Sequence, residues 1–255
     1  MKVVILAGGF GSRLGHVTEL IPKPMVEVGG KPMLWHIMKI YAHYGYNEFV
    51  IALGYKGAVI KDYFSKIHLY NSDFTINTKT GEVVYHNSGD DEWKITLVDT
   101  GLETLKGGRI KRLEPYLDDV NMLTYGDGVT SLDISKLVQY HSEHNKMVTI
   151  TGVHPPSMFG NLNEKDGQVL SFEEKPQTSD GLINGGFMVF NKEMLQHLTT
   201  DKDCDFEFGP LEKLASDGEV MVYKFSGFWE CADTVRDVNH LNKLWSTDSA
   251  DWKVW

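Results

Sequence analysis

The residues best suited to chemistry at the start of the chain lie in LAGGFGSRL, at Leu6–Leu14. An apolar, strand-like segment, VVILA, runs directly into three glycines, Gly8, Gly9 and Gly11. Glycines at such a join allow a tight turn whose backbone N–H groups converge on an oxyanion. Arg13 adds a planar guanidinium that fits phosphate oxygens. The stretch therefore predicts a phosphate-binding loop.

A second cation, Lys23, stands between two prolines that restrict its backbone and favour a fixed position for the ammonium group. Either cation alone is also consistent with a solvated loop residue, whereas the two beside a strand–glycine join favour phosphate binding. A dinucleotide-binding turn needs a third glycine where this chain has Leu14. A Walker A loop also has no match here.

Two aspartates could supply carboxylates to a site. Asp127 follows the apolar segment Asn121–Tyr125 and stands between two glycines, which predicts a carboxylate at the edge of a sheet. Asp233 begins a helical pattern, so a helix N-cap is an alternative role for it. A turn residue is the alternative for Asp127.

The elements that position these residues alternate between strand and helix, which predicts an α/β fold. We expect a Rossmann-like, mixed but mostly parallel sheet flanked by helices. Strands are predicted at Lys2–Ala7, Glu48–Leu53, Lys94–Asp99, Asn121–Tyr125, Met147–Val153, Val169–Glu173 and Phe187–Phe190. Helices are predicted at Pro32–Gly45, Ala58–Ile67, Gly107–Tyr116, Asp133–His144, Phe206–Ser216 and Asp233–Trp245, with Asp133 as an N-cap.

One segment departs from this alternation. Asp73–His86 reads as a β-hairpin that extends from the main sheet, and it is unnecessary for the predicted chemistry. It is expected to be either a solvent-exposed arm or a contact to a neighbouring subunit. No low-complexity linker divides the chain, so residues 1–255 are expected to form a single domain with this hairpin as an extension.

The composition restricts the classes of partner. Lys and Arg number 25 against 35 Asp and Glu, and the formal net charge of −10 argues against a nucleic-acid partner. No run of about 18 apolar residues and no signal-peptide pattern is present, so we expect no membrane partner and a cytoplasmic protein. The two cysteines are too few for a disulfide framework and match no zinc signature.

These motifs together resemble those of the sugar-1-phosphate nucleotidylyltransferases. That family carries a Leu-Ala-Gly-Gly-x-Gly-Ser/Thr-Arg-Leu signature, with Pro-Lys-Pro shortly after it. Four later segments resemble further motifs of the family in the same order: Tyr125–Gly128 (YGDG), Phe172–Pro176 (FEEKP), Ile183–Gly186 (INGG), and Gly227–Trp229 (GFW) followed by Asp233 and Thr234. The resemblance spans residues 6 to 234.

Three segments, TLVDTG, GGRIKR and LTYGDGV, are more particular and resemble the members of the family that use CTP. The resemblance implies that CTP and α-D-glucose 1-phosphate give CDP-glucose and pyrophosphate, for dideoxysugars of surface polysaccharide, in a homo-oligomer for which a hexamer is one candidate. Relatives that use UTP, dTTP or GTP, or another sugar 1-phosphate, remain alternatives. A non-catalytic homologue that binds a sugar nucleotide is a third.

The resemblance also implies a role for each matched residue. It makes three cations catalytic, namely Arg13, Lys23 and Lys175. It assigns nucleotide contacts to Leu6, Ala7, Gly8, Gly9, Phe10, Gly11, Ser12, Arg13, Lys23, Thr104, Arg109 and Gly126. It assigns the sugar phosphate to Lys175, Asn184 and Gly185, and Mg²⁺ to Asp127 and Asp233.

Overall fold

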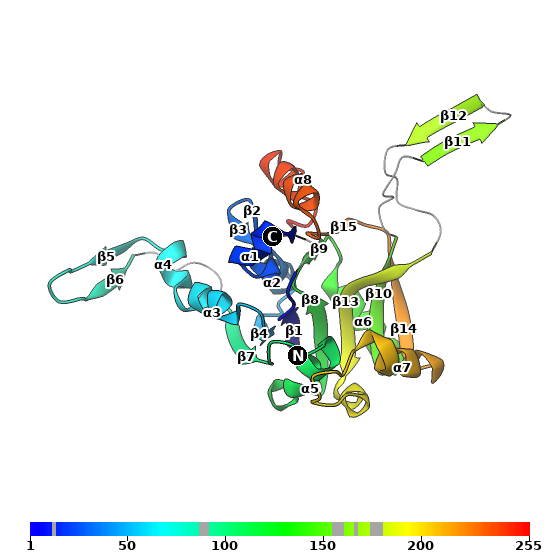
Figure 1. The fold of residues 1–255 in the computed structure, drawn as a ribbon, viewed down its shortest axis with the longest axis horizontal. Coiled ribbons are helices and arrows are strands. Elements are labelled where there is room, and N and C mark those ends of the chain that lie inside the picture. Colours follow the sequence, from blue (N-terminus) through cyan, green and yellow to red (C-terminus); the bar gives the residue numbers. More distant parts are fainter. Residues whose placement is uncertain (12–13, 87–91, 155–160, 166–167, 174–180) are drawn as a thin grey trace.

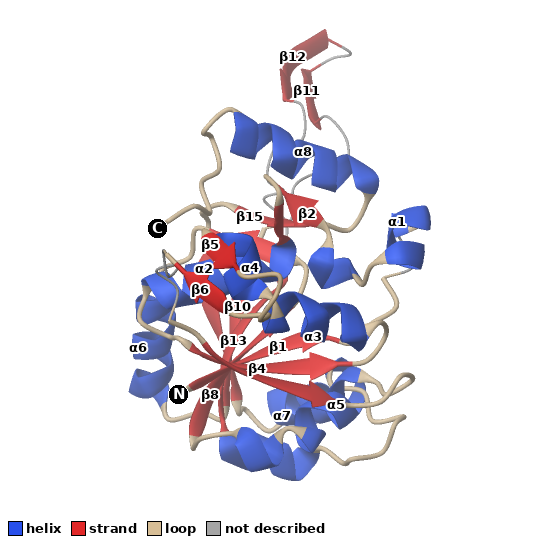
Figure 2. Ribbon diagram, turned by 90° about the vertical axis from the view of Figure 1, so that its left-hand side faces the viewer, coloured by secondary structure: helices blue, strands red, loops and turns tan. Residues whose placement is uncertain are grey.

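The protein, described here by a computed structural model, is built on a seven-stranded mixed sheet with helices on both faces (Figures 1 and 2). The structure describes residues 1–11, 14–86, 92–154, 161–165, 168–173 and 181–255. The strand order is β14-β10-β13-β8-β1-β4-β7. The fold class predicted from the alternation of elements is confirmed.

The observed strands of the sheet agree closely with the predicted ones, except that Ile183–Asn191 was predicted only as Phe187–Phe190 and Val220–Phe225 was not predicted. They are β1 Lys2–Ala7, β4 Glu48–Leu53, β7 Lys94–Asp99, β8 Val120–Tyr125, β10 Val148–Val153, β13 Ile183–Asn191 and β14 Val220–Phe225. The neighbouring strands β8, β1, β4 and β7 are all parallel, and β10 is parallel to β14. Strand β13 is antiparallel to both of its neighbours. The carboxyl ends of the four parallel strands therefore meet at one edge of the sheet.

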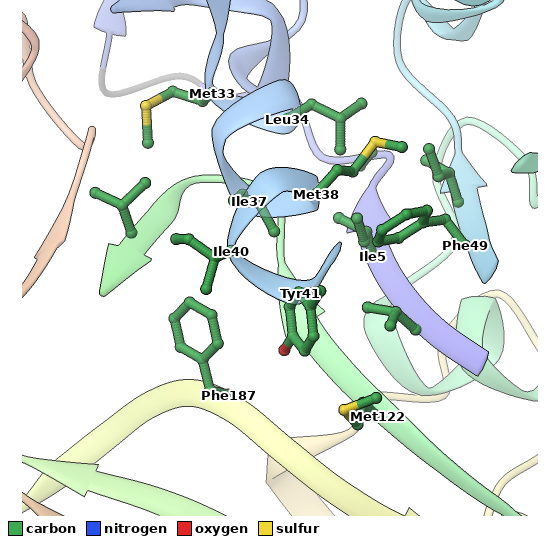
Figure 3. Packing of buried hydrophobic residues seen from close by; sticks show 14 of the residues in the cluster. Ile5, Met33, Leu34, Ile37, Met38, Ile40, Tyr41, Phe49, Met122 and Phe187 are labelled. Carbon is green, nitrogen blue, oxygen red and sulfur yellow. The ribbon is translucent and has the colours of Figure 1, made fainter. Parts of the chain in front are cut away.

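Alternation along β1 explains the two layers of core. Val3 and Ile5 face the helix α2 (Met33–His43), which packs Ile37, Met38 and Tyr41 on this side of the sheet (Figure 3). The intervening residues of the strand face the other side, where they pack with α5 (Lys106–Arg112) and α7 (Glu212–Ser216). Because successive side chains of a strand point to opposite faces, a fully apolar strand must be covered on both.

The remaining helices include two short ones that were not predicted, His16–Leu20 and Ile67–Asn71, and one predicted helix is broken. They are α1 His16–Leu20, α3 Gly57–Ser65, α4 Ile67–Asn71, α6 Ile134–His144 and α8 Val235–Ser246, with 3₁₀ turns at Lys23–Met25, Glu114–Tyr116 and Lys192–His197. Asp133 caps α6 as predicted, accepting from the backbone N–H of Lys136. The predicted helix Phe206–Ser216 is broken at Gly209 (φ 97°), just before Pro210, so regular α-helix begins only at Glu212.

Four short two-stranded antiparallel ribbons complete the described part of the fold. The segment Asp73–His86 holds β5 (Phe74–Ile76) and β6 (Val83–Tyr85), which pair with each other and project away from the central sheet (Figure 1). The other pairs are β2 Glu27–Val28 with β3 Lys31–Pro32, β9 Gly128–Thr130 with β15 Trp229–Cys231, and β11 Asn161–Lys165 with β12 Gln168–Glu173. Of these strands only β12 was predicted, as Val169–Glu173, and it lies outside the main sheet. In the described part of the chain, no helix has the length and apolar character needed to cross a bilayer.

A buried histidine on α2 joins the C-terminal tryptophans to the core. The His36 ring is fully buried, its Nε2 lies 2.8 Å from the carbonyl oxygen of Val28, and the Trp252 indole N–H donates to its Nδ1 at 3.3 Å. These partners fit a neutral ring that carries its proton on Nε2. Burial lowers the pKa of His36 to about 4.

We expect this histidine to make folding stability depend on pH. Its folded pKa lies below its ordinary value of 6.5, so the unfolded chain binds a proton first as the pH falls. Up to about 3 kcal/mol of the free energy of unfolding should be lost between pH 6.5 and 4. Urea unfolding at several pH values measures this slope, and His36→Gln should flatten it. An equal slope in the two proteins would rule out this source.

Candidate active site

The carboxyl ends of the parallel strands open into a cavity of about 410 Å³. This size suits a nucleotide or sugar phosphate, and the position is where open α/β sheets bind ligands. All the described members of the predicted nucleotide set and both aspartates line it: Leu6, Ala7, Gly8, Gly9, Phe10, Gly11, Lys23, Thr104, Arg109, Gly126, Asp127 and Asp233. Ser12, Arg13 and Lys175 lie outside the described residues.

Two glycines of the first loop are required by what packs against them. A Cβ on Gly8 would lie 2.3 Å from Nη1 of Arg109, which is too close for any side chain. Gly11 has φ +64°, and a Cβ there would lie 2.9 Å from Cβ of Lys23. The loop thus lies directly on two of the predicted site cations, and glycine is what permits this approach.

The buried side chain of Arg109 connects the loops around the cavity by hydrogen bonds. Its side chain is 4% exposed, and its terminal nitrogens donate five hydrogen bonds of 2.6–3.1 Å to Leu53 O, Thr100 Oγ1, Gly101 O, Gly8 O and Leu102 O. Those acceptors lie at the end of β4 and in the loops that follow β1 and β7. Burial, and then the neighbouring Arg112, lower the pKa of Arg109. Because the N–H groups of both terminal nitrogens already donate to the protein, we infer that Arg109 positions the loops.

Thr104 is engaged in a similar way. It is buried at the edge of the cavity, and its Oγ1 accepts a hydrogen bond from Nη1 of Arg112 at 2.9 Å. Arg112 also donates to the carbonyl oxygen of Thr100 at 2.7 Å. The two arginines of the GGRIKR segment, one turn apart on α5, therefore fix the loop between β7 and α5.

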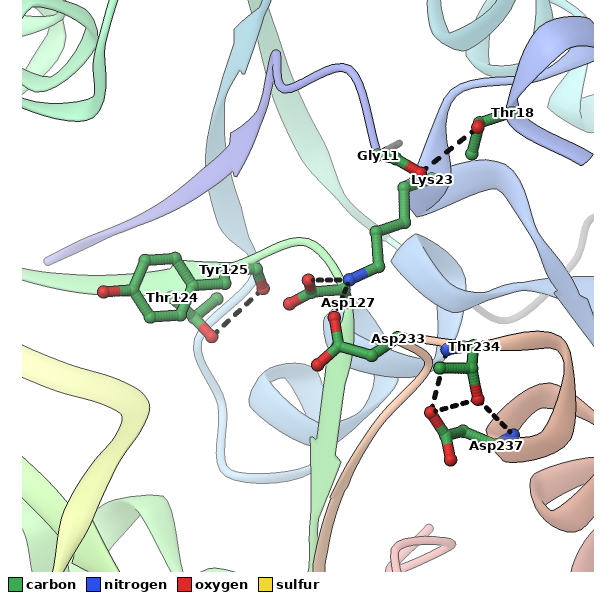
Figure 4. A network of polar contacts seen from close by, with 9 residues as sticks. All are labelled: Gly11, Thr18, Lys23, Thr124, Tyr125, Asp127, Asp233, Thr234 and Asp237. Carbon is green, nitrogen blue, oxygen red and sulfur yellow. Dashed lines mark hydrogen bonds and ion pairs between the residues drawn. The ribbon is translucent and has the colours of Figure 1, made fainter. Parts of the chain in front are cut away.

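Lys23 begins a 3₁₀ turn whose second residue is the buried Pro24. Pro22 is extended (φ −69°, ψ 149°), and the turn closes where the Val26 N–H donates to the carbonyl oxygen of Lys23. The two prolines therefore fix the backbone on both sides of the lysine, as the sequence predicted. The side chain extends from this turn beneath Gly11 into the cavity (Figure 4).

The two candidate metal carboxylates come from segments more than a hundred residues apart, joined by the β9–β15 ribbon. Gly128 pairs with Cys231, and the Ala232 N–H donates to the carbonyl oxygen of Asp127 at 2.8 Å. This register places Asp127 and Asp233 side by side. Both carboxylates reach one nitrogen, Nζ of Lys23, which lies 2.5 Å from Asp127 Oδ2 and 2.6 Å from Asp233 Oδ1 (Figure 4).

The alternative role of Asp233 as a helix cap does not hold. Thr234 is the N-cap of α8, and it forms a capping box with Asp237: each side chain accepts a hydrogen bond from the other's backbone N–H. The helix thus begins one residue later than a cap at Asp233 would require. The Asp233 carboxylate turns toward the cavity instead.

The donor set fits a divalent cation. The two carboxylates already converge on one positive charge, and Mg²⁺ needs only one or two protein carboxylates when phosphate oxygens and water complete its shell. Within the described ranges, no three His, Cys, Asp or Glu side chains gather as a metal cage. Burial works against the charge of Lys23, but Asp127 and Asp233 outweigh it, so the pKa of Lys23 is raised.

The predicted sugar-phosphate residues lie beside the cavity, on β13. The Asn184 side-chain amide donates to the Tyr125 hydroxyl at 3.1 Å, and Gly185 O accepts from the Trp229 indole N–H at 2.7 Å. Tyr125 itself lines the cavity, so this hydrogen bond connects Asn184 to the cavity wall. Neither Asn184 nor Gly185 lines the cavity itself.

Sequence reasoning missed the polar network on this side. The Tyr125 hydroxyl donates to Glu207 Oε1 at 2.6 Å, and Nζ of Lys106 reaches the same oxygen at 2.6 Å. Lys106 and Tyr125 both line the cavity. Their sequence positions could have indicated a site role, because Lys106 directly precedes the GGR motif and Tyr125 directly precedes Gly126-Asp127. Glu207 had no such signal, because it lies in the broken segment that was predicted as regular helix.

Comparison with known proteins agrees with this geometry. A family model described as nucleotidyl transferase matches residues 2–248. The chain therefore belongs to the nucleotidyl transferase family. A putative glucose-1-phosphate thymidylyltransferase from Bacillus anthracis has the same fold, with a TM-score of 0.68 over 98% of this chain and 96% of that one, at 20% sequence identity.

Within the family, the chain is most informatively compared with two curated relatives. It is 46% identical to a glucose-1-phosphate cytidylyltransferase from Salmonella typhimurium and 44% identical to a probable one from Bacillus subtilis. Both alignments cover 100% of this chain and 100% of the relative. This likeness groups the chain with the glucose-1-phosphate cytidylyltransferases.

Proposed function

We propose that the protein joins CTP and α-D-glucose 1-phosphate to give CDP-glucose and pyrophosphate. A phosphate oxygen of the sugar attacks the α-phosphorus of CTP in line, and pyrophosphate leaves. The observation that carries this proposal is the convergence of Asp127, Asp233 and Lys23 at the mouth of a glycine-lined cavity. Full-length identity of 44–46% to cytidylyltransferases supports the choice of base and sugar.

The chain's contribution to this reaction is positioning and charge. A phosphate monoester is already a nucleophile, so neither a general base nor a covalent residue is needed. Lys23, with Arg13, would neutralise the triphosphate and the leaving pyrophosphate. The backbone N–H groups of Gly8–Gly11 would bind the phosphates, and Lys175, Asn184 and Gly185 would hold the sugar phosphate.

We assign Mg²⁺ to the carboxylates of Asp127 and Asp233. These two residues would hold the ion, which would supply positive charge to stabilise the negative charge that develops on the leaving group. Among the described residues no three His, Cys, Asp or Glu side chains gather here, and two carboxylates completed by phosphate oxygens and water make an all-oxygen set that favours Mg²⁺ or Mn²⁺ over zinc.

Pyrophosphate release tests the proposal. The protein is assayed with glucose 1-phosphate and Mg²⁺, and CTP, UTP, dTTP, GTP and ATP are supplied separately. We expect CTP to be preferred at least about tenfold, because a pocket built for one base leaves its polar groups unpaired with another. Preference for another nucleotide would overturn the assignment of cytosine as the base. Inactivity with all five nucleotides would overturn the assignment of glucose 1-phosphate as the sugar substrate.

We further propose that the protein acts as a homo-oligomer, with the β5–β6 hairpin against a neighbouring copy. Four apolar residues of the hairpin are 41–52% exposed: Phe74, Ile76, Val84 and Tyr85. Replacing residues 74–85 by a short Gly-Ser linker should therefore reduce the mass measured by light scattering after size-exclusion chromatography. An unchanged mass would contradict this role.

The cytoplasm is the proposed location. Cys204 and Cys231 are both unpaired, which suits a reducing compartment. The substrates of the proposed reaction, a nucleoside triphosphate and a sugar phosphate, are also compounds that a cell retains inside its membrane.

A further inference from the structure

The ammonium group of Lys23 lies where the proposed metal would bind. Its Nζ is 2.5 Å from Asp127 Oδ2 and 2.6 Å from Asp233 Oδ1, so one cation already bridges the two carboxylates. The lysine side chain is only 12% exposed, against 26% for Asp127 and 37% for Asp233. The lysine therefore lies on the protein side of the cluster, and the carboxylates face the cavity.

Without a cation, this cluster would hold two adjacent negative charges at the edge of a cavity. The two carboxylates contact the same nitrogen and so lie close enough to repel each other, and partial burial strengthens this repulsion. A lysine suits the role of internal counter-ion, because its ammonium carries three donors on a flexible four-carbon chain. Here two of the possible donors are directed at the two carboxylates (Figure 4).

We propose that Lys23 is the counter-ion of the metal carboxylates in the metal-free protein and that a divalent cation displaces its ammonium group. Metal binding thereby releases Lys23 toward the triphosphate. The inference rests on the proposed function for the identity of the metal ligands. It adds an exchange of one cation for another, in which no covalent bond forms or breaks.

The backbone around Lys23 allows this exchange without refolding. The 3₁₀ turn between Pro22 and Pro24 fixes the Cα, and the first part of the side chain packs beneath Gly11. Only the distal carbons must move for Nζ to leave the carboxylates. Because the side chain passes under the glycine loop, the released ammonium stays beside the N–H groups that would bind phosphate.

A competing internal cation must weaken metal binding. The metal binds only the fraction of molecules in which the lysine has left the carboxylates, so its apparent affinity falls by that fraction. Removing the ammonium should remove the competition. Lys23→Met keeps a side chain of similar length without the charge, so it separates this role from packing.

The experiment measures Mn²⁺ binding in the absence of nucleotide and sugar, from the electron paramagnetic resonance signal of the free ion. We expect Lys23→Met to bind Mn²⁺ on the order of tenfold more tightly than the parent protein. Lys106→Met is the matched control, because it removes a charge from the same cavity but from a lysine that pairs with Glu207. The Mn²⁺ affinity of Lys106→Met should exceed that of the parent protein by less than about threefold.

Thermal unfolding gives a second readout. Without metal, Lys23→Met should unfold at a lower temperature than the parent, because its two carboxylates have lost their counter-ion. Added Mn²⁺ should raise that temperature more in the variant than in the parent. Mn²⁺ affinity that is unchanged or weaker in Lys23→Met, or an equal gain in Lys106→Met, overturns the proposal. Because no turnover is measured, this outcome is independent of whether CTP proves to be the substrate.

Discussion

Asp127→Asn is expected to lower the rate of CDP-glucose formation at least about 100-fold while leaving the fold intact. Asparagine has nearly the same shape, so the turn between β8 and β9 and the hydrogen bond from the Ala232 N–H to the backbone carbonyl oxygen of residue 127 should be unaffected. The substitution removes the negative charge of residue 127, which is one of the two carboxylates proposed to hold the metal.

Initial rates of pyrophosphate release, with circular dichroism as a check of folding, measure this effect. Asp133→Asn is the matched control, since Asp133 caps α6 and asparagine caps a helix equally well. The control should retain nearly full activity. Residual activity of Asp127→Asn above about a tenth of the parent's would show that the reaction does not depend on this carboxylate.

The glycine loop and the positions of the parallel strands along the chain were predictable because local signals determine them. A β-branched, apolar run that ends in Gly-Gly defines β1 and the turn after it, and each later strand–helix repeat places another loop at the same edge of the sheet. The flanking prolines similarly indicated a fixed Lys23. These features depend on residues that are close together in the sequence.

Features that depend on long-range pairing were not predictable in this way. Strand β13 runs antiparallel between β10 and β8, although nothing in its own apolar sequence specifies direction. The β9–β15 ribbon joins three-residue strands about a hundred positions apart, and such short strands carry little periodicity. Because this ribbon brings Asp127 and Asp233 together, the metal site could be inferred from sequence only through family resemblance.

The capping of α8 shows how a local rule can fail by one residue. Asp, Thr and Ser all cap helices, so the sequence Asp233-Thr234 offers two candidates. The structure selects Thr234, since Asp237 lies three residues beyond it and completes a capping box. The presence of Asp237 was a signal in the sequence that favoured Thr234 and left Asp233 available for the site.

Arg109→Met is expected to cause the largest loss of stability among single substitutions around the cavity. The methionine side chain fills a similar space but cannot donate, so the five hydrogen bonds to the end of β4 and to the loops after β1 and β7 are lost. Leu53 O and Gly8 O keep the backbone N–H groups of Thr100 and Tyr55 as donors. Each lost hydrogen bond from a charged donor costs about 1.5–3 kcal/mol, although these costs are not additive. We expect a loss of about 3 kcal/mol or more, or about 6–12 °C in the midpoint of thermal unfolding.

The same substitution should impair nucleotide binding through the loops rather than through a lost contact. Arg109 Nη2 donates to both Gly8 O and Leu102 O, on two loops that line the cavity, so its removal should raise the KM for CTP roughly tenfold even at temperatures where the protein is folded. Lys111→Met, on the same helix, breaks only an ion pair with Glu114 and should change stability by less than about 1 kcal/mol. Calorimetry and steady-state kinetics test both effects. If Arg109→Met raised KM without lowering the unfolding midpoint, the guanidinium would act on the nucleotide directly, and the support role inferred from its five hydrogen bonds would be wrong.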